Sequence, residues 1–175
     1  MVTLIDGKVV AQKIKEDVKR QVAAFVQKTS TQPTLATVLV GEDPASKIYV
    51  RNKINACGYC GIASVHKTLP ADTTAAELLK LVHELNVDPN VHGILVQFPL
   101  PKHINTAVVI QAIDPKKDVD GFHPFNLGLL MSGHQAMLEP CTPAGVMELF
   151  KHYQIPVAGK DVLIVGRSNI MGKPM

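Results

Sequence analysis

The sequence contains only three cysteines, an odd number that is too small for a disulfide framework and that suits a reducing cytoplasm. It has no apolar run near the roughly 18 residues needed to cross a bilayer. Its amino end, residues 1–10, lacks the basic-then-apolar order of a signal peptide. These absences predict a protein of the cytoplasm that does not span a membrane.

Charge is also scarce: charged residues make up 19% of the chain, and the formal net charge is only +3. The densest basic stretch, Lys13–Arg20, is interrupted by Glu16 and Asp17, which favours a solvated helix face over a nucleic-acid patch. The seven histidines show no metal-ligand spacing. We therefore expect neither a nucleic-acid partner nor a bound metal.

The hydrophobic share of 46% indicates a folded globular chain, and 175 residues allow one domain or two small ones. Strand-like and helix-like segments alternate along it. The expected strands are residues 34–40, 63–69 and 91–97. The expected helices are residues 45–56, 73–86, 104–113 and 145–153. This order predicts an α/β fold, a three-layer αβα domain with a parallel sheet.

Residues 114–143 are rich in glycine and proline and are interpreted as a linker or a site-bearing loop. We place a domain boundary near residue 140, which separates residues 1–140 from residues 141–175. In the second part, residues 160–165 are expected to form a strand that enters the loop between Gly166 and Gly172. Such a loop can bind phosphate as the start of a Rossmann-type domain, although its spacing does not match G-x-G-x-x-G and an ordinary turn remains possible.

Four polar side chains are candidates for chemistry. Tyr49 and Lys53 are four residues apart, so they share one helix face, where a desolvated lysine can act as a base. A surface lysine is the simpler interpretation. Gln97 follows an expected parallel strand at the edge where such sheets bind ligands, or it caps a turn. A carboxylate of residues 116–121, Asp118 or Asp120, can accept two N–H bonds from a guanidine-like ring edge, or the segment is a solvated turn. If Asp120 is that carboxylate, Asp118 is expected to point elsewhere.

Cys57 and Cys60 form a C-x-x-C pair, which in other proteins is a redox motif. The pair falls at the expected carboxyl end of a helix, where the helix dipole disfavours thiolate. We therefore interpret both as inert thiols. A thiol redox protein is kept as a competing function.

Five segments in order resemble the bifunctional methylenetetrahydrofolate dehydrogenase/cyclohydrolase family of one-carbon metabolism. They are Tyr49-x-x-x-Lys53, residues 93–101, residues 117–121, residues 140–143, and residues 166–168 with 172–174. The resemblance covers nearly the whole chain. It implies oxidation of 5,10-methylenetetrahydrofolate by NADP, then hydrolysis of the methenyl cation to 10-formyltetrahydrofolate, a step that also serves purine biosynthesis. It further implies a homodimer that acts on tetrahydrofolate derivatives.

The resemblance assigns roles to individual residues. Lys53 is the central group of the hydrolytic step, Tyr49 packs against the folate, and Gln97 hydrogen-bonds the lysine. Asp120 holds the pterin edge, and Leu100 forms part of the wall for the aminobenzoyl ring. Residues implied at the NADP site are Gly166, Arg167, Ser168 and Thr142.

Members of the family continue well beyond the point that corresponds to Met175. We therefore expect this chain to hold only the first part of the nucleotide domain, residues 141–175, and not to support dehydrogenase activity alone. The alternative function is a non-catalytic folate-binding or dimerisation fragment.

Overall fold

The computed structural model describes residues 4–175; the first three residues, part of the amino end considered for a signal peptide, lie outside this range. Its strands are β1 (Thr34–Val40), β2 (Ala63–Leu69) and β3 (Gly93–Val96). They form one parallel sheet in the order β2-β1-β3. The two first-named strands match the expected ranges residue for residue, and β3 is shorter than expected because only four of its residues pair with β1.

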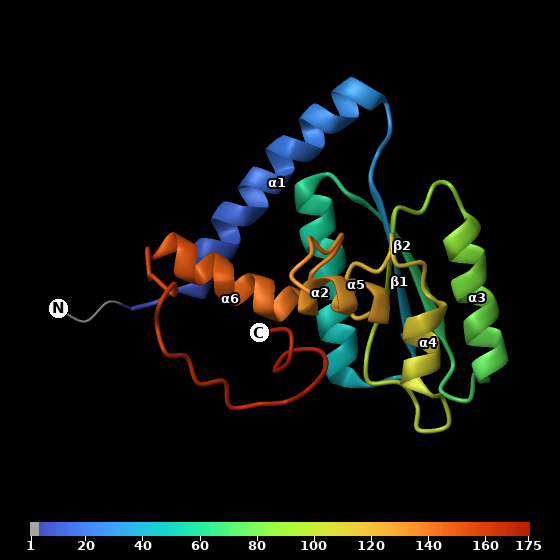
Figure 1. The fold of residues 1–175 in the computed structure, drawn as a ribbon. Helices are drawn as coiled ribbons and strands as arrows, with labels where there is room; N and C mark the ends of the chain where they lie inside the picture. Colours follow the sequence, from blue (N-terminus) through green and yellow to red (C-terminus); the bar gives the residue numbers. More distant parts are fainter. Residues whose placement is uncertain (1–3) are drawn as a thin grey trace.

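Helices cover both faces of this sheet (Figure 1). One layer contains α1 (Gly7–Thr29) and α2 (Pro44–Cys60), and the other contains α3 (Ala75–Val87) and α4 (Thr106–Ala112). The chain then forms α5 (Pro124–Met131) and α6 (Cys141–His152). The expected three-layer α/β architecture with a parallel sheet is thereby confirmed.

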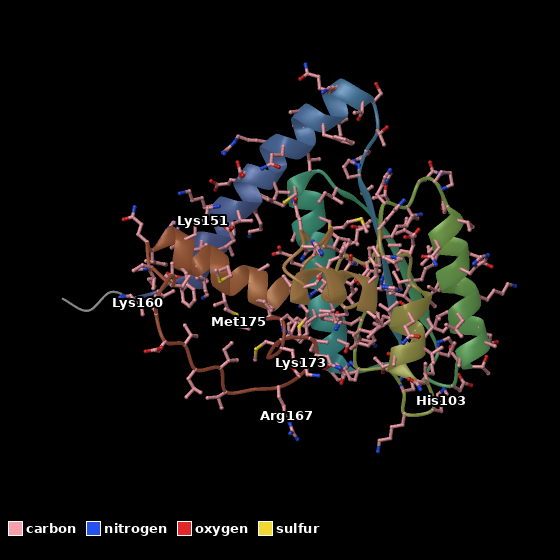
Figure 2. The ribbon with its side chains drawn as sticks, in the orientation of Figure 1. His103, Lys151, Lys160, Arg167, Lys173 and Met175 are labelled. Atoms are coloured by element: carbon pink, nitrogen blue, oxygen red, sulfur yellow. The ribbon has the colours of Figure 1, made fainter. Side chains whose placement is uncertain are left out.

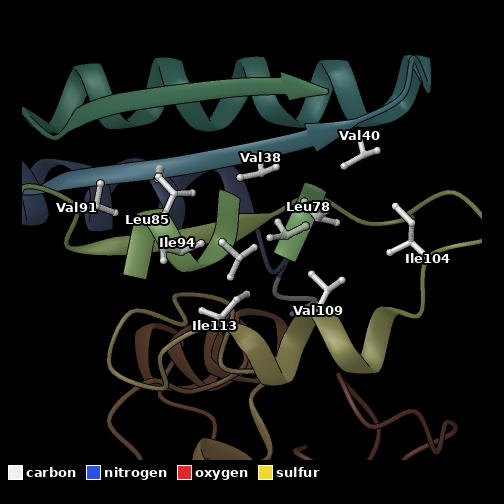
Figure 3. Packing of buried hydrophobic residues seen from close by; sticks show 12 residues of the cluster. Val38, Val40, Leu78, Leu85, Val91, Ile94, Ile104, Val109 and Ile113 are labelled. Carbon is white, nitrogen blue, oxygen red and sulfur yellow. The ribbon is translucent and has the colours of Figure 1, made fainter. Parts of the chain in front are cut away.

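The core lies between the sheet and the α3/α4 layer (Figure 3). Successive side chains of a strand point to opposite faces, so Ala36, Val38 and Val40 of β1 all face this layer. Leu78 and Val82 of α3, one turn apart, meet them and are fully buried. The apolar residues that recur at helical spacing in α3 are therefore the ones that pack this helix against the sheet.

Local signals set the helix ends. Asp43 caps α2 by accepting a hydrogen bond from the Ser46 amide at 2.7 Å, and Pro44 occupies the first turn. Helix α2 does not end at residue 56 as expected. It continues to Cys60 because Gly61, at φ 80°, adopts the left-handed conformation that ends the helix.

Two expectations for the second half of the chain were wrong. Residues 114–143 are not wholly irregular: they include α5, which His123 caps by accepting from the Phe125 amide. Residues 160–165 are not a strand, because within residues 4–175 no other strand lies beside them to pair with. Leu163 and Val165 of this extended segment are almost fully exposed, at 88% and 89%.

The expected solvated face of Lys13–Arg20 is confirmed, because these residues lie on α1 and its only buried residue is Val10. Helix α6 packs near the amino end of α1, where the Asp6 amide donates to the Tyr153 hydroxyl at 2.8 Å. From α6 the chain runs away from the body as an extended segment and returns toward its centre (Figure 1). In the part of the chain that the structure describes, no helix is both long and apolar enough for a membrane span.

Candidate functional site

Lys53 and Gln97 meet where β3 ends. The Gln97 amide N–H donates to the Val38 carbonyl at 2.8 Å, which extends the sheet by one residue and fixes the glutamine backbone. The side-chain Nε2 of Gln97 donates to the Phe98 carbonyl at 2.7 Å, so Oε1 is left to accept from Nζ of Lys53 at 3.2 Å. The contact joins α2 to the carboxyl edge of the sheet, the edge at which parallel α/β sheets bind ligands.

Asp120 lies close enough to Lys53 for the two side chains to interact electrostatically. Burial raises the pKa of the Asp120 carboxyl, the nearby Lys53 opposes this rise, and Asp118 adds to it. The net direction is upward because removal from water is the largest of the three effects. A carboxyl with a perturbed pKa beside a lysine and a glutamine amide is typical of a functional site.

Asp118, two residues earlier, has a different surrounding. It is buried, and its Oδ2 accepts from the His123 amide at 2.8 Å and from Nδ2 of Asn126 at 3.1 Å. We expected Asp118 to point elsewhere, and its Oδ2 is used inside the fold, although its charge still acts on the neighbouring Asp120. The carboxylate holds the start of α5 in place and is therefore not free to bind a ligand with this oxygen.

A close backbone contact brings the start of α6 to the same place. Gly121 has φ 68°, and a Cβ on it would lie 2.4 Å from the carbonyl carbon of Glu139, so only glycine fits. This approach places Cys141 near Asp120 and Lys53, both of which influence its thiol. Burial is the main reason that the pKa of Cys141 is raised. We did not predict Cys141 as a site residue from the sequence, where only the motif of residues 140–143 pointed to it.

Tyr49 and Leu100, which were also predicted to contact folate, do not belong to this cluster. Tyr49 lies one helical turn before Lys53 and is 61% exposed, and within residues 4–175 its hydroxyl has no hydrogen-bond partner. Leu100 is half-buried and packs against the hydrophobic core. The structure therefore brings together Lys53, Gln97 and Asp120, and it leaves Tyr49 open to solvent beside them.

The residues predicted for a nucleotide form a separate loop. Oγ of Ser168 accepts from the amides of Met171 and Gly172 at 3.2 and 3.3 Å. A Cβ on Gly172 would lie 2.4 Å from the Gly166 oxygen, so the loop closes on itself only with glycine at this position. Arg167 is exposed and points away from the body of the protein (Figure 2). No hydrogen bond within residues 4–175 joins this loop to Thr142, which is exposed in the first turn of α6.

The loop residues 169–174 also face a cavity of about 420 Å³ between them and the helices α4 and α5. Its walls are mostly apolar and include Phe122, Leu127 and Ile170. None of the predicted site residues lines it. This mostly apolar cavity is therefore distinct from the cluster of Lys53, Gln97 and Asp120.

The C-x-x-C pair agrees with the interpretation of inert thiols. Cys57 and Cys60 are both buried at the carboxyl end of α2, and neither forms a disulfide. Burial raises the pKa of the Cys57 thiol, so it is not activated. Across residues 4–175, no group of three or more His, Cys, Asp or Glu side chains is arranged to hold a metal ion.

Comparison with known families gives two adjacent matches. Residues 5–120 match the catalytic domain of tetrahydrofolate dehydrogenase/cyclohydrolase, and residues 140–175 match the NAD(P)-binding domain of the same enzymes. Among curated proteins, the chain is 55% identical over 175 residues to "Bifunctional protein FolD 2" of Geobacter metallireducens. It is 56% identical over 172 residues to "Bifunctional protein FolD" of Campylobacter concisus. The chain spans 61% and 60% of the length of these two relatives.

Solved structures agree with the sequence matches. The bifunctional FolD enzyme of Campylobacter jejuni superposes with a TM-score of 0.96 at 48% identity, over 99% of this chain and 61% of that one. The Trypanosoma brucei enzyme, solved with NADP cofactor and an inhibitor, gives a TM-score of 0.94 at 35% identity, over 99% of this chain and 59% of that one. By the extent of the catalytic-domain match and by these likenesses, the chain belongs to the tetrahydrofolate dehydrogenase/cyclohydrolase family.

Proposed function

We propose that this chain serves the oxidation of 5,10-methylenetetrahydrofolate by NADP and the hydrolysis of the resulting methenyl cation to 10-formyltetrahydrofolate. The observation that carries the proposal is the contact of Lys53 Nζ with Gln97 Oε1 beside the half-buried Asp120. Family membership supplies the reaction class, and these three groups supply what the hydrolytic step needs. The proposed place in metabolism is one-carbon transfer, including purine biosynthesis.

In the hydrolytic step, water adds to the methenyl carbon and a C–O bond forms. Lys53 in its amine form takes the proton that the water loses and returns it to the ring nitrogen as the C–N bond breaks, while the remaining hydroxyl group loses its proton to solvent and becomes the formyl C=O. An ammonium at the same place would repel the cationic substrate, so the amine form is the one that acts. Gln97 accepts an N–H of Lys53 and thereby directs the nitrogen lone pair away from the amide.

The substrate is positioned by groups around this pair. Asp120, once ionised, presents two acceptor oxygens to the adjacent N–H groups of the pterin ring. Tyr49 offers an exposed aromatic face one turn from Lys53, and Leu100 offers an apolar wall after β3. These contacts raise the rate by holding the reacting carbon next to the Lys53 amine.

The residues of the glycine loop fit a dinucleotide phosphate. A glycine loop after a strand-like segment can let a phosphate approach the backbone, and Gly172 closes this loop tightly against the Gly166 carbonyl. Arg167 is exposed beside it and suits a ribose 2′-phosphate, and Ser168 and Thr142 would supply hydroxyl groups. When bound, NADP supplies the acceptor for the hydride.

Two further features belong to the proposal. We divide the chain into a folate-binding catalytic domain, residues 1–140, and the first part of the NADP-binding domain, residues 141–175. The family matches end at residue 120 and begin again at residue 140, which supports this division. We also propose a homodimer in the cytoplasm, a reducing compartment that suits three unpaired cysteines.

A kinetic experiment separates this function from a non-catalytic folate-binding or dimerisation fragment. Hydrolysis of methenyltetrahydrofolate by the protein is followed spectroscopically, and tetrahydrofolate binding is titrated in parallel. We expect hydrolysis above the spontaneous rate in the full-length protein. Folate binding without hydrolysis would support the fragment interpretation, and absence of both would contradict the proposed function.

Arg167→Ala is expected to weaken NADP binding to the full-length protein much more than NAD binding. A hydrogen bond to a charged group contributes roughly 1.5–3 kcal/mol, which corresponds to about 10- to 150-fold in affinity. Titration of both nucleotides into wild type and variant measures the difference. Equal losses for NADP and NAD would mean that Arg167 does not contact the 2′-phosphate.

A further inference from the structure

The loop that carries Asp120 is tied to the carboxyl end of α3 by one lysine. Nζ of Lys117 donates to the backbone carbonyls of Leu85, Asn86 and Asp88 at 3.1, 2.7 and 2.8 Å. An ammonium has three N–H donors, so all of them are used. The last carbonyls of a helix lack partners inside the helix and carry the negative end of its dipole, which makes this end a matched acceptor for the cation.

The same helix end holds the loop a second time. The side chain of Asn86 donates to the Ala112 carbonyl at 2.7 Å and accepts from the Asp114 amide at 2.9 Å. The Lys117 amide in turn donates to the Asp114 carbonyl at 2.8 Å, which closes a turn. The segment from the end of α4 to Lys117 is thus fixed on α3 before the site residues begin.

From Lys117 the chain passes directly to the site. The Lys117 carbonyl accepts from the Ile94 amide at 2.7 Å, and Ile94 pairs with Asp118 as an isolated parallel bridge to β3. Only Val119 then separates this bridge from Asp120. The groups that face the Asp120 carboxyl are Lys53 on α2, Asp118 on its own loop, and Cys141 on α6.

We propose that Lys117 is a positioning residue for Asp120: its three hydrogen bonds to the end of α3 hold the Asp120 loop so that the half-buried carboxyl stays beside Lys53. Lys117 touches neither Lys53 nor Gln97 in its hydrogen bonds, so it acts through the loop and not on the substrate. The placement is a property of the free protein. Its consequence for folate binding rests on the proposed function.

Lys117→Met keeps the length of the side chain and removes its charge and all three donors. We expect the loop to loosen and to admit water to Asp120. Since burial is the main cause of the raised pKa of Asp120, the pKa should fall toward that of an ordinary aspartate. A lysine that only stabilised the fold would lower the melting temperature without changing how Asp120 titrates in the folded protein.

The test is a ¹³C-carboxyl NMR titration of the full-length protein without ligand, well below its melting temperature. The Asp120 signal is assigned as the one that Asp120→Asn removes. We expect a lower Asp120 pKa in Lys117→Met, a smaller change in Lys117→Arg, and no change in Lys80→Met, which removes an exposed lysine from the same helix. An Asp120 pKa in folded Lys117→Met equal to that of wild type would overturn the proposal.

If Lys117→Met does not fold, Lys117→Gln is titrated in its place, because glutamine retains two N–H donors. A lower Asp120 pKa in that variant supports the proposal, and a pKa equal to that of wild type overturns it. Tetrahydrofolate binding is then measured for each folded variant, with an expected loss of about 5- to 150-fold in Lys117→Met. Unchanged affinity would overturn the claim that this positioning serves folate. Absence of binding to wild type would contradict the proposed function, while the NMR titration still decides the role of Lys117.

Discussion

Replacement of Lys53 by alanine or glutamine should abolish methenyltetrahydrofolate hydrolysis by the full-length protein and leave its fold intact. Lys53 is the proposed acceptor of the proton from water, and loss of a general acid–base group typically costs about 10²–10⁴ in rate. Its Nζ makes one hydrogen bond to another side chain, to Gln97 at 3.2 Å, so little of the fold depends on it. The rate is followed spectroscopically, and circular dichroism reports the fold.

The matched control for this prediction is Lys47→Gln. Lys47 lies on the same helix, is exposed, and forms an ion pair with the exposed Glu42. Exposed ion pairs contribute about 0–1 kcal/mol, so neither stability nor hydrolysis should change greatly. Hydrolysis at the wild-type rate in both Lys53 variants would remove this lysine from the mechanism.

Asp120→Asn should weaken folate binding and hydrolysis and spare nucleotide binding. Asparagine keeps the size of the side chain but presents an NH₂ donor to the pterin's own donors, or flips and leaves one bond unmade. An unpaired buried polar group costs about 1–3 kcal/mol, which corresponds to roughly 5- to 150-fold in affinity. Separate titrations of folate and of nucleotide measure the two effects.

Two aspartates serve as comparisons for Asp120. Asp72→Asn alters an exposed carboxylate after β2 and should change nothing. Asp118→Asn should act first on stability, because its Oδ2 accepts two hydrogen bonds in the interior. If Asp118→Asn impaired folate binding in a folded protein and Asp120→Asn did not, the pterin contact would belong to the other carboxylate.

The raised pKa of Asp120 also fixes the sign of the pH dependence. Folate binding needs the carboxylate, so it is lost as pH falls through this raised pKa, and the loss begins at a higher pH than for an ordinary aspartate. The pH dependence of folding stability has the opposite sign. Because the folded state holds this proton more tightly than the unfolded state, stability falls as pH rises through the raised pKa. Asp120→Asn should therefore be at least as stable as wild type at neutral pH, which separates lost binding from lost structure.

Local patterns in the sequence determined most of the secondary structure of residues 34–113, whereas the full extent of α1 was not predicted. Two strands were predicted at their observed bounds, from the apolar run of residues 34–40 and from the segment 63–69. Such strands are typically bounded by turn-forming residues, which mark where they begin and end. The helical period that includes Leu78 and Val82 predicted the face of α3 that packs on the sheet. Asp43 and Pro44 predicted where α2 begins, because a helix cap is made by neighbours in the chain.

The same local reasoning failed where a segment depends on distant partners. An apolar run such as residues 160–165 has the composition of a strand, but a strand exists only through hydrogen bonds to another strand, and none lies beside it within residues 4–175. Helix α5 was missed because glycines and prolines dominate residues 114–143. Its start is held by His123 and by the buried Asp118, and sequence periodicity reports neither contact.

For the candidate site, the sequence by itself determined the residue types and the helical spacing of Tyr49 and Lys53, and the family resemblance added their expected roles. Only the tertiary structure decided that Nζ of Lys53 reaches Gln97, 44 residues away, and that Asp120 is half-buried near them while Asp118 is used inside the fold. It alone revealed that Lys117 joins the Asp120 loop to α3. The physical reason is that burial and hydrogen-bond partners depend on contacts between segments far apart in the chain, whereas helix spacing and capping depend on residues within a turn of one another.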